Sequence, residues 1–156
     1  MRIHDFASAG DCGAVQVELR NGVSVDARDE RDYTPLACAL SNIDSDEQML
    51  RLLISSGADV NAGIEGSKYF PIGLAACSGS LSNVQRLLDT GAIVNFVSPE
   101  GYTVLVNIMY ALRDNMKLIP VADLLVKNGP IIDCETRYGE SPLIVASIQG
   151  RFDAVK

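Results

Sequence analysis

YFPIGLAACSGSLSNVQRLLDTGAIVN, residues 69–95, is the stretch that decides the fold. Its proline suits the first turn of a helix, because the N–H groups of that turn have no partner inside the helix. A glycine-containing turn follows, and then a second segment has apolar residues at helical spacing up to Leu88, with Gly91 just beyond it. The stretch therefore predicts two helices joined by a tight turn.

Two markers of this unit recur in phase along the chain. A glycine followed by small or apolar residues and Asp or Asn appears in NGVSVD, SGADVN, TGAIVN and NGPIID, at intervals of 35, 34 and 38 residues. Twelve or thirteen residues after each glycine comes a helix start, in the order TPL, FPI, TVL and SPL. Thr34, Thr103 and Ser141 can cap these helices through a side-chain oxygen. The chain is therefore an internal repeat.

This pattern resembles the ankyrin repeat, whose period is about 33 residues and whose first helix opens with T-P-L-H-x-A. LRLLISSGADVNA and QRLLDTGAIVN match the second helix and following loop of that family. The resemblance covers essentially the whole chain. It implies an all-α solenoid of about five stacked helix–turn–helix units, with β-hairpin fingers projecting from the stack.

The register divides one domain, residues 1–156, into an N-terminal capping repeat, three internal repeats and an incomplete last repeat: 1–28, 29–63, 64–97, 98–135 and 136–156. His4 falls where the family has its T-P-L-H histidine, which bonds neighbouring loop backbone, and we expect that role here. Asp5 and Glu18 replace the leucines of a regular unit. A terminal repeat needs such polar residues because nothing stacks on its outer face.

The fourth unit departs most from the regular one. Asn107 stands where a buried leucine is usual, and Ile108 replaces an alanine. The turn between its two helices is also longer. We expect a first helix near 103–113, a loop at 115–117 and a second helix opened by Pro120.

Bulk composition excludes several function classes. The net charge of -7 and the pI near 4.6 argue against a nucleic-acid ligand, since such binders carry a basic stripe. No apolar run reaches the roughly 18 residues of a membrane helix. The N-terminus lacks the apolar core of a secretory signal. We therefore expect a cytoplasmic protein, unless a leader precedes it in the natural chain.

Catalytic or metal chemistry is not expected. The single histidine, His4, cannot complete a zinc finger or a credible catalytic triad on a capping helix. No glycine loop has the lysine and hydroxyl residue of a phosphate-binding loop. We predict no enzyme activity, no cofactor and no metal, with the widely spaced cysteines as reduced thiols in packing positions: Cys12, Cys38, Cys77 and Cys134.

Tyrosine is the most informative residue type for binding. Tyr33, Tyr69 and Tyr102 each precede a helix start, and Tyr138 lies two residues earlier at the next one. In the resembled family, the fingers and the ends of the first helices face a concave groove used for partners. Tyrosine is rigid, amphipathic and enriched at binding hot spots, although each ring could instead cover its own hairpin. Charged finger residues and two groove-end positions complete the predicted set: Arg28, Arg31, Lys68, Glu100, Arg137, Ser78 and Tyr110.

These observations predict a non-catalytic protein–protein interaction module that docks a preformed surface. The alternative is a regulatory or substrate-recruiting domain of a longer protein, an enzyme or a channel, that continues beyond residue 156. Ile144, Ile148, Phe152 and Val155 do not form a polar cap, which favours either continuation or self-association through the C-terminal repeat. Asn61 matches a family context for asparagine hydroxylation, but we predict a structural hydrogen bond there. The partner's identity is not encoded in these patterns.

Overall fold

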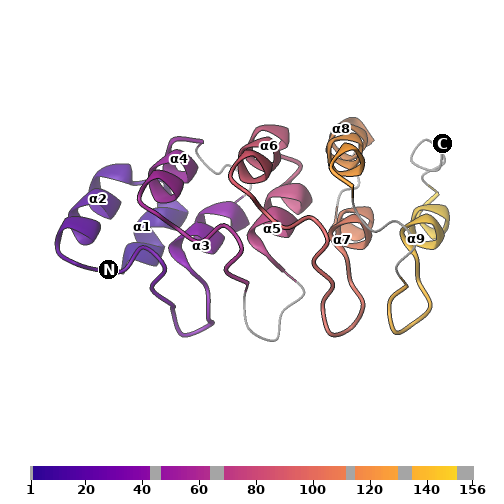
Figure 1. Cartoon of the computed structure of the whole chain (residues 1–156), viewed down its shortest axis with the longest axis horizontal. Helices are drawn as coiled ribbons and strands as arrows, with labels where there is room; N and C mark the ends of the chain where they lie inside the picture. Colours follow the sequence, from indigo (N-terminus) through magenta and orange to yellow (C-terminus); the bar gives the residue numbers. More distant parts are fainter. Residues whose placement is uncertain (1, 43–46, 64–68, 112–114, 130–134, 151–156) are drawn as a thin grey trace.

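The computed structural model describes residues 2–42, 47–63, 69–111, 115–129 and 135–150. Helices in these ranges form two rows, with the odd-numbered helices side by side in one row and the even-numbered helices in the other (Figure 1). Loops project from the row of odd-numbered helices. The helices are α1 (Ile3–Ala9), α2 (Cys12–Arg20), α3 (Pro35–Ser41), α4 (Glu47–Ser55), α5 (Pro71–Ser78), α6 (Leu81–Asp89), α7 (Val104–Ala111), α8 (Asn115–Lys127) and α9 (Pro142–Ile148).

Side-chain caps start three of the odd-numbered helices, as the sequence predicts. Thr34 accepts a hydrogen bond from the N–H of Ala37 at 3.1 Å, and Thr103 and Ser141 accept equivalent bonds at 3.3 Å. Phe70 has no such bond. Its ring contacts Phe96 and fills the space beside Gly63, so the third unit replaces a polar cap with aromatic packing.

The second marker of the repeat is confirmed by backbone geometry. The four marker glycines, at positions 22, 57, 91 and 129, have φ angles of 88°, 91°, 90° and 74°. Each of them lies two residues beyond the end of an even-numbered helix, α2, α4, α6 or α8. A residue with a Cβ atom is strained in this left-handed conformation, which is why glycine marks the position in every unit.

One continuous core runs through the stack. Each odd-numbered helix packs on the next, from α1 to α9, and α6 packs on α8 in the second row. Leucine and isoleucine side chains such as Leu36, Ile72 and Leu87 are almost fully buried between the rows. His4 is also buried, and its Nε2 lies 2.8 Å from the carbonyl oxygen of Ala27, which confirms its expected bond to neighbouring loop backbone.

One prediction for the fourth unit is wrong. α8 begins at Asn115 rather than at Pro120, so the loop expected at 115–117 is helical and the proline lies inside the helix. Leu118, Val121 and Leu125 are buried on one face of α8, whereas Pro120 is exposed. Burial of Leu118 favours a helix that starts before the proline and outweighs the backbone bond that proline removes.

The fingers are turns rather than β-hairpins in the part of the chain that the structure describes, where no residue is in a β-strand. The N–H of Asp29 donates to the carbonyl of Tyr33 at 3.0 Å, and the same bond joins residues 98 to 102 and 136 to 140. We call these three segments, 29–33, 98–102 and 136–140, the finger turns. Most of the third unit's finger lies outside the described residues.

Candidate partner-binding surface

The five tyrosines differ in how much of each ring a partner could reach. Tyr33, Tyr69 and Tyr102 are each half-buried, and Tyr102 packs against the core. Tyr110 is 39% exposed and Tyr138 is 67% exposed. The row predicted from the sequence therefore contains three partly covered rings and two open ones, and the open rings both lie toward the C-terminal end of the stack.

Each finger turn is held by the side chain of its first residue, a feature that the sequence analysis missed. Asp29 Oδ1 accepts from the N–H groups of Arg31 and Tyr33, both at 2.8 Å. Ser98 and Thr136 accept the equivalent pairs of bonds at 3.1 to 3.3 Å. The signal was present, because Asp29, Ser98 and Thr136 each lie five residues before a capping Thr or Ser. These bonds give the fingers one conformation.

Charge reinforces the first of these turns. The pKa of Asp29 is lowered: burial alone would raise it, but the hydrogen bonds from the backbone of Tyr33 and Arg31 and the nearby cationic groups outweigh burial. The carboxylate of Asp29 is therefore ionised at neutral pH. An ionised acceptor makes a stronger hydrogen bond than a hydroxyl does.

Neighbouring fingers are also tied to one another. Nη1 of Arg28 lies 2.8 Å from the carbonyl oxygen of Asp32, 2.9 Å from its carboxylate and 2.7 Å from the carbonyl oxygen of Gly63 in the next unit. The N–H of Arg137 donates to the carbonyl of Glu100 at 2.9 Å, and their side chains form an ion pair at 3.8 Å. Arg28, Glu100 and Arg137 were predicted to contact a partner, and they also hold the row of fingers together.

Tyr110 and Glu140 join the end of α7 to the last finger turn. A hydrogen bond from the Tyr110 hydroxyl to the Glu140 carboxylate, with smaller contributions from burial and from that negative charge, raises the pKa of Tyr110 to about 12. Arg137 places its guanidinium 5.3 Å from the centroid of the Tyr138 ring. These contacts gather two open rings, a cation and a carboxylate at one end of the finger row.

The remaining predicted residues are less informative. Ser78 is half-buried and its hydroxyl donates to the carbonyl of Ala75 at 2.8 Å, so it is engaged within α5. Arg31 is exposed. Lys68 lies outside the described residues. Asn61 donates to the carbonyl of Gly91 at 3.1 Å and accepts from the N–H of Ile93 at 2.8 Å, which confirms the predicted structural role.

Reactive chemistry is sparse within the described ranges. Three cysteines there, Cys12, Cys38 and Cys77, are not joined to one another by disulfides. Burial, reinforced by the charges of Asp29 and Asp5, raises the pKa of Cys38 to about 11, so its thiol stays protonated at neutral pH. Among the same residues, no group of three or more His, Cys, Asp and Glu side chains could hold a metal ion. No helix of this part of the chain is long and apolar enough to cross a membrane.

Family models for ankyrin repeats match most of the chain. The family model for ankyrin repeats in three copies matches residues 72–156, and the model for a single ankyrin repeat matches residues 31–63. The human protein named ankyrin repeat and SOCS box protein 6 is 30% identical over 139 residues, which are 87% of this chain and 32% of that protein. Its counterpart in Pongo abelii is 29% identical over the same shares of both chains.

A viral protein is also similar. The ankyrin repeat domain-containing protein M-T5 of myxoma virus (strain Lausanne) is 36% identical over 73 residues, which are 44% of this chain and 15% of the viral protein. This chain spans about a third of the length of the two SOCS box relatives. Because the family models match more than half of its residues, the chain belongs to the ankyrin repeat family.

Proposed function

We propose that this chain is a non-catalytic interaction module that binds a protein partner through its finger turns and the adjoining ends of its odd-numbered helices. The observation that carries the proposal is the repeated finger turn, fixed internally at residues 29–33, 98–102 and 136–140. A surface whose loops are already ordered loses little conformational entropy on binding, so its contacts count more fully toward affinity.

The chemistry of the surface supports a protein partner. Tyr110 and Tyr138 supply open aromatic area, and large rigid rings with a polar tip are enriched at protein-binding hot spots. Arg137 and Glu140 surround these rings with charges of both signs. A mixed rim of this kind adjusts specificity and association rate more than affinity.

The test compares two double variants with wild type. Tyr110→Ala/Tyr138→Ala removes the open rings, whereas Val17→Ala/Val126→Ala removes side chains that are 52% and 47% exposed on α2 and α8, away from the fingers. After a partner has been isolated and purified, we expect the tyrosine variant to weaken its affinity by about tenfold or more, as for loss of a hot spot. The valine variant should bind as wild type does.

The half-buried rings form a second arm of the test. Tyr33→Ala/Tyr69→Ala/Tyr102→Ala removes the row of tyrosines that precede the helix starts, and circular dichroism must first show that this variant folds. If both tyrosine variants fold and bind the purified partner as tightly as wild type, the finger surface is not the binding site and the proposal is wrong.

A second candidate function is recruitment within a longer protein. Leu143 is 55% exposed on α9, whereas Leu36 and Ile72 at the equivalent positions are almost fully buried. An open apolar face of this kind fits a further repeat, another domain or a second copy of the chain. Light scattering that gives a strict monomer, together with a natural stop codon after Lys156, would reject this candidate.

A further inference from the structure

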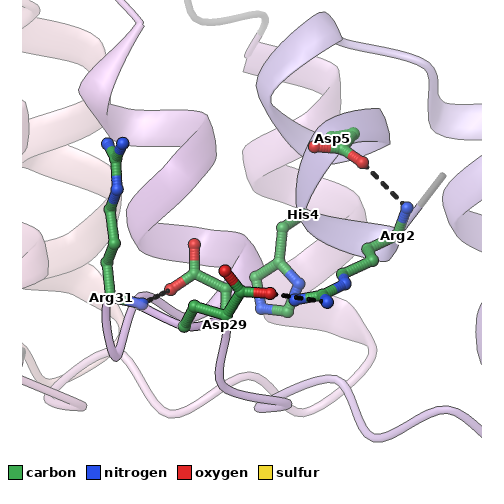
Figure 2. A pocket seen from close by; sticks show the side chains of 6 residues that line it. Arg2, His4, Asp5, Asp29 and Arg31 are labelled. Carbon is green, nitrogen blue, oxygen red and sulfur yellow. Dashed lines mark hydrogen bonds and ion pairs between the residues drawn. The ribbon is translucent and has the colours of Figure 1, made fainter.

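A small polar pocket lies at the N-terminal end of the finger row, between the start of α1 and the finger turn 29–33 (Figure 2). It has a volume of about 210 Å³. This is below the roughly 300 to 1,000 Å³ of typical small-molecule sites, and it suits the end of one long side chain. The lining residues are Arg2, His4, Asp5, Asp29, Glu30 and Arg31.

His4 gives the pocket an unsatisfied hydrogen-bond acceptor. Its Nε2 lies 2.8 Å from the carbonyl oxygen of Ala27. A carbonyl can only accept, so Nε2 carries a proton, and in the neutral form of the ring Nδ1 then holds a lone pair. His4 is only 7% exposed, and its Nδ1 is buried with no hydrogen-bond partner in the part of the chain that the structure describes. Figure 2 shows one nitrogen of the ring turned toward Arg2.

The side chains around His4 favour a positively charged donor. Asp5, Asp29 and Glu30 bring three carboxylates to the pocket, and only Oδ1 of Asp29 is used by the finger turn. Arg2 contributes one positive charge, through an ion pair with Glu30 at 2.8 Å. Arg31 points its guanidinium away from His4 and presents its backbone instead (Figure 2). An anion would meet these carboxylates and would offer no proton to Nδ1.

From this geometry we propose that the pocket receives a lysine or arginine side chain of the protein partner. The inference rests on the proposed function and names the chemistry of one contact within it. The incoming ammonium or guanidinium donates to Nδ1 of His4 and pairs with the carboxylates of Asp29 and Glu30. The incoming cation replaces Arg2 as the partner of Glu30. The Arg2–Glu30 ion pair opposes this replacement only weakly, because its side chains are 61% and 80% exposed and such pairs are weak in water.

The single histidine makes the test direct, because its ring nitrogens give an unambiguous nitrogen-15 signal in NMR. The probes are the blocked tripeptides acetyl-Gly-Arg-Gly-amide and acetyl-Gly-citrulline-Gly-amide, which have nearly the same shape but differ in charge. They are added up to about 20 mM at about pH 8. We expect the arginine peptide to move the Nδ1 signal progressively and the citrulline peptide to leave it unchanged.

Two charge-neutralising variants provide the controls. Glu30→Gln removes an exposed carboxylate that pairs with Arg2, and it should weaken the arginine-peptide response by up to about fivefold. Asp123→Asn makes the same charge change on an exposed residue of α8 and should leave the response as in wild type. Equal responses to the two peptides, no response to arginine, or equal weakening by both variants would each overturn the inference.

The outcome also separates this inference from the proposed function. If the arginine peptide leaves His4 unchanged while Tyr110→Ala/Tyr138→Ala still weakens the purified partner, the pocket inference is wrong and the finger surface stands. If the arginine peptide binds but the tyrosine variants keep full affinity for the partner, the proposed finger surface is rejected.

Discussion

Replacing Gly101 with alanine should separate two neighbouring fingers. Gly101 has a φ angle of 83°, and a Cβ atom placed there would lie 2.7 Å from the carbonyl oxygen of Glu135 and 2.8 Å from Cα of Thr136. Both are backbone atoms at the start of the next finger, so no side-chain rotation relieves the overlap. The finger turn 98–102 would have to move away from the finger turn 136–140.

The loss of folding stability in Gly101→Ala has two parts, one from the backbone conformation and one from the overlap with neighbouring atoms. An L-residue in the left-handed region costs about 1–2 kcal/mol, and forcing an extra carbon into a packed site typically costs about 1–3 kcal/mol. Gly101→Ala should therefore lower the free energy of unfolding by about 2–5 kcal/mol. Gly91 has a φ angle of 90° but no atom within 4 Å of the added Cβ, so Gly91→Ala should cost only the first part.

Urea denaturation of wild type, Gly101→Ala and Gly91→Ala measures both parts. A third variant, Gly73→Ala, adds a Cβ within α5 where nothing lies within 4 Å and φ is not positive, and it should stabilise the protein by up to about 1 kcal/mol. If Gly101→Ala and Gly91→Ala cost the same within about 0.5 kcal/mol, the contact between the fingers does not constrain position 101 and the reasoning fails. Affinity for a purified partner should fall in Gly101→Ala alone.

Three further predictions concern titrating groups. Hydrogen bonds from Arg51 and Arg86 lower the pKa of Glu47 from its ordinary value of 4.5. The ionised carboxylate therefore stabilises the folded protein above pH 4.5, and this stabilisation is lost as the pH falls through the lowered pKa. Urea midpoints of wild type and Glu47→Gln should therefore converge on acidification, and a constant gap would contradict this. Glu140→Gln should move the pKa of Tyr110 from about 12 toward 10 in a tyrosinate absorbance titration, and the stabilisation by this hydrogen bond should be lost between those values. Iodoacetamide should alkylate Cys38 slowly at about pH 8 and faster toward pH 11, and rapid labelling of the folded protein at the lower pH would contradict its raised pKa.

The helical framework was predictable because its signals are local. Thr34, Thr103 and Ser141 sit at the starts of three helices in the positions that a cap requires, and the marker glycines adopt the left-handed conformation that only glycine takes without strain. The prediction failed at Pro120, where a local rule against proline in helices competed with burial of Leu118. Tertiary packing outweighed the local rule, and no sequence pattern within a few residues of Pro120 indicates that outcome.

The candidate binding surface was predictable only in part. Register alone placed Tyr33, Tyr69 and Tyr102 in equivalent positions, but it did not indicate that all three rings are half-buried. The bond from Arg28 to the carbonyl of Gly63 spans two units and has no sequence signature. The pocket around His4 is a further case, because it combines residues near position 4 with residues near position 30.

The two ends of the finger row are held by different interactions, so the two ends should contribute differently to partner recognition. At position 32 the turn contains the only non-glycine residue with positive φ among the described residues, at 64°, and Arg28 holds Asp32 there through its carboxylate and carbonyl. At the equivalent position 101 glycine needs no such support, and a backbone bond from Arg137 joins the neighbouring fingers. Salt screens the ion pair of Arg28 with Asp32 but barely affects the backbone bond of Arg137. The N-terminal end, where the charged pocket lies, should therefore govern the salt dependence and charge selectivity of binding, while Tyr110 and Tyr138 supply affinity that persists at high ionic strength.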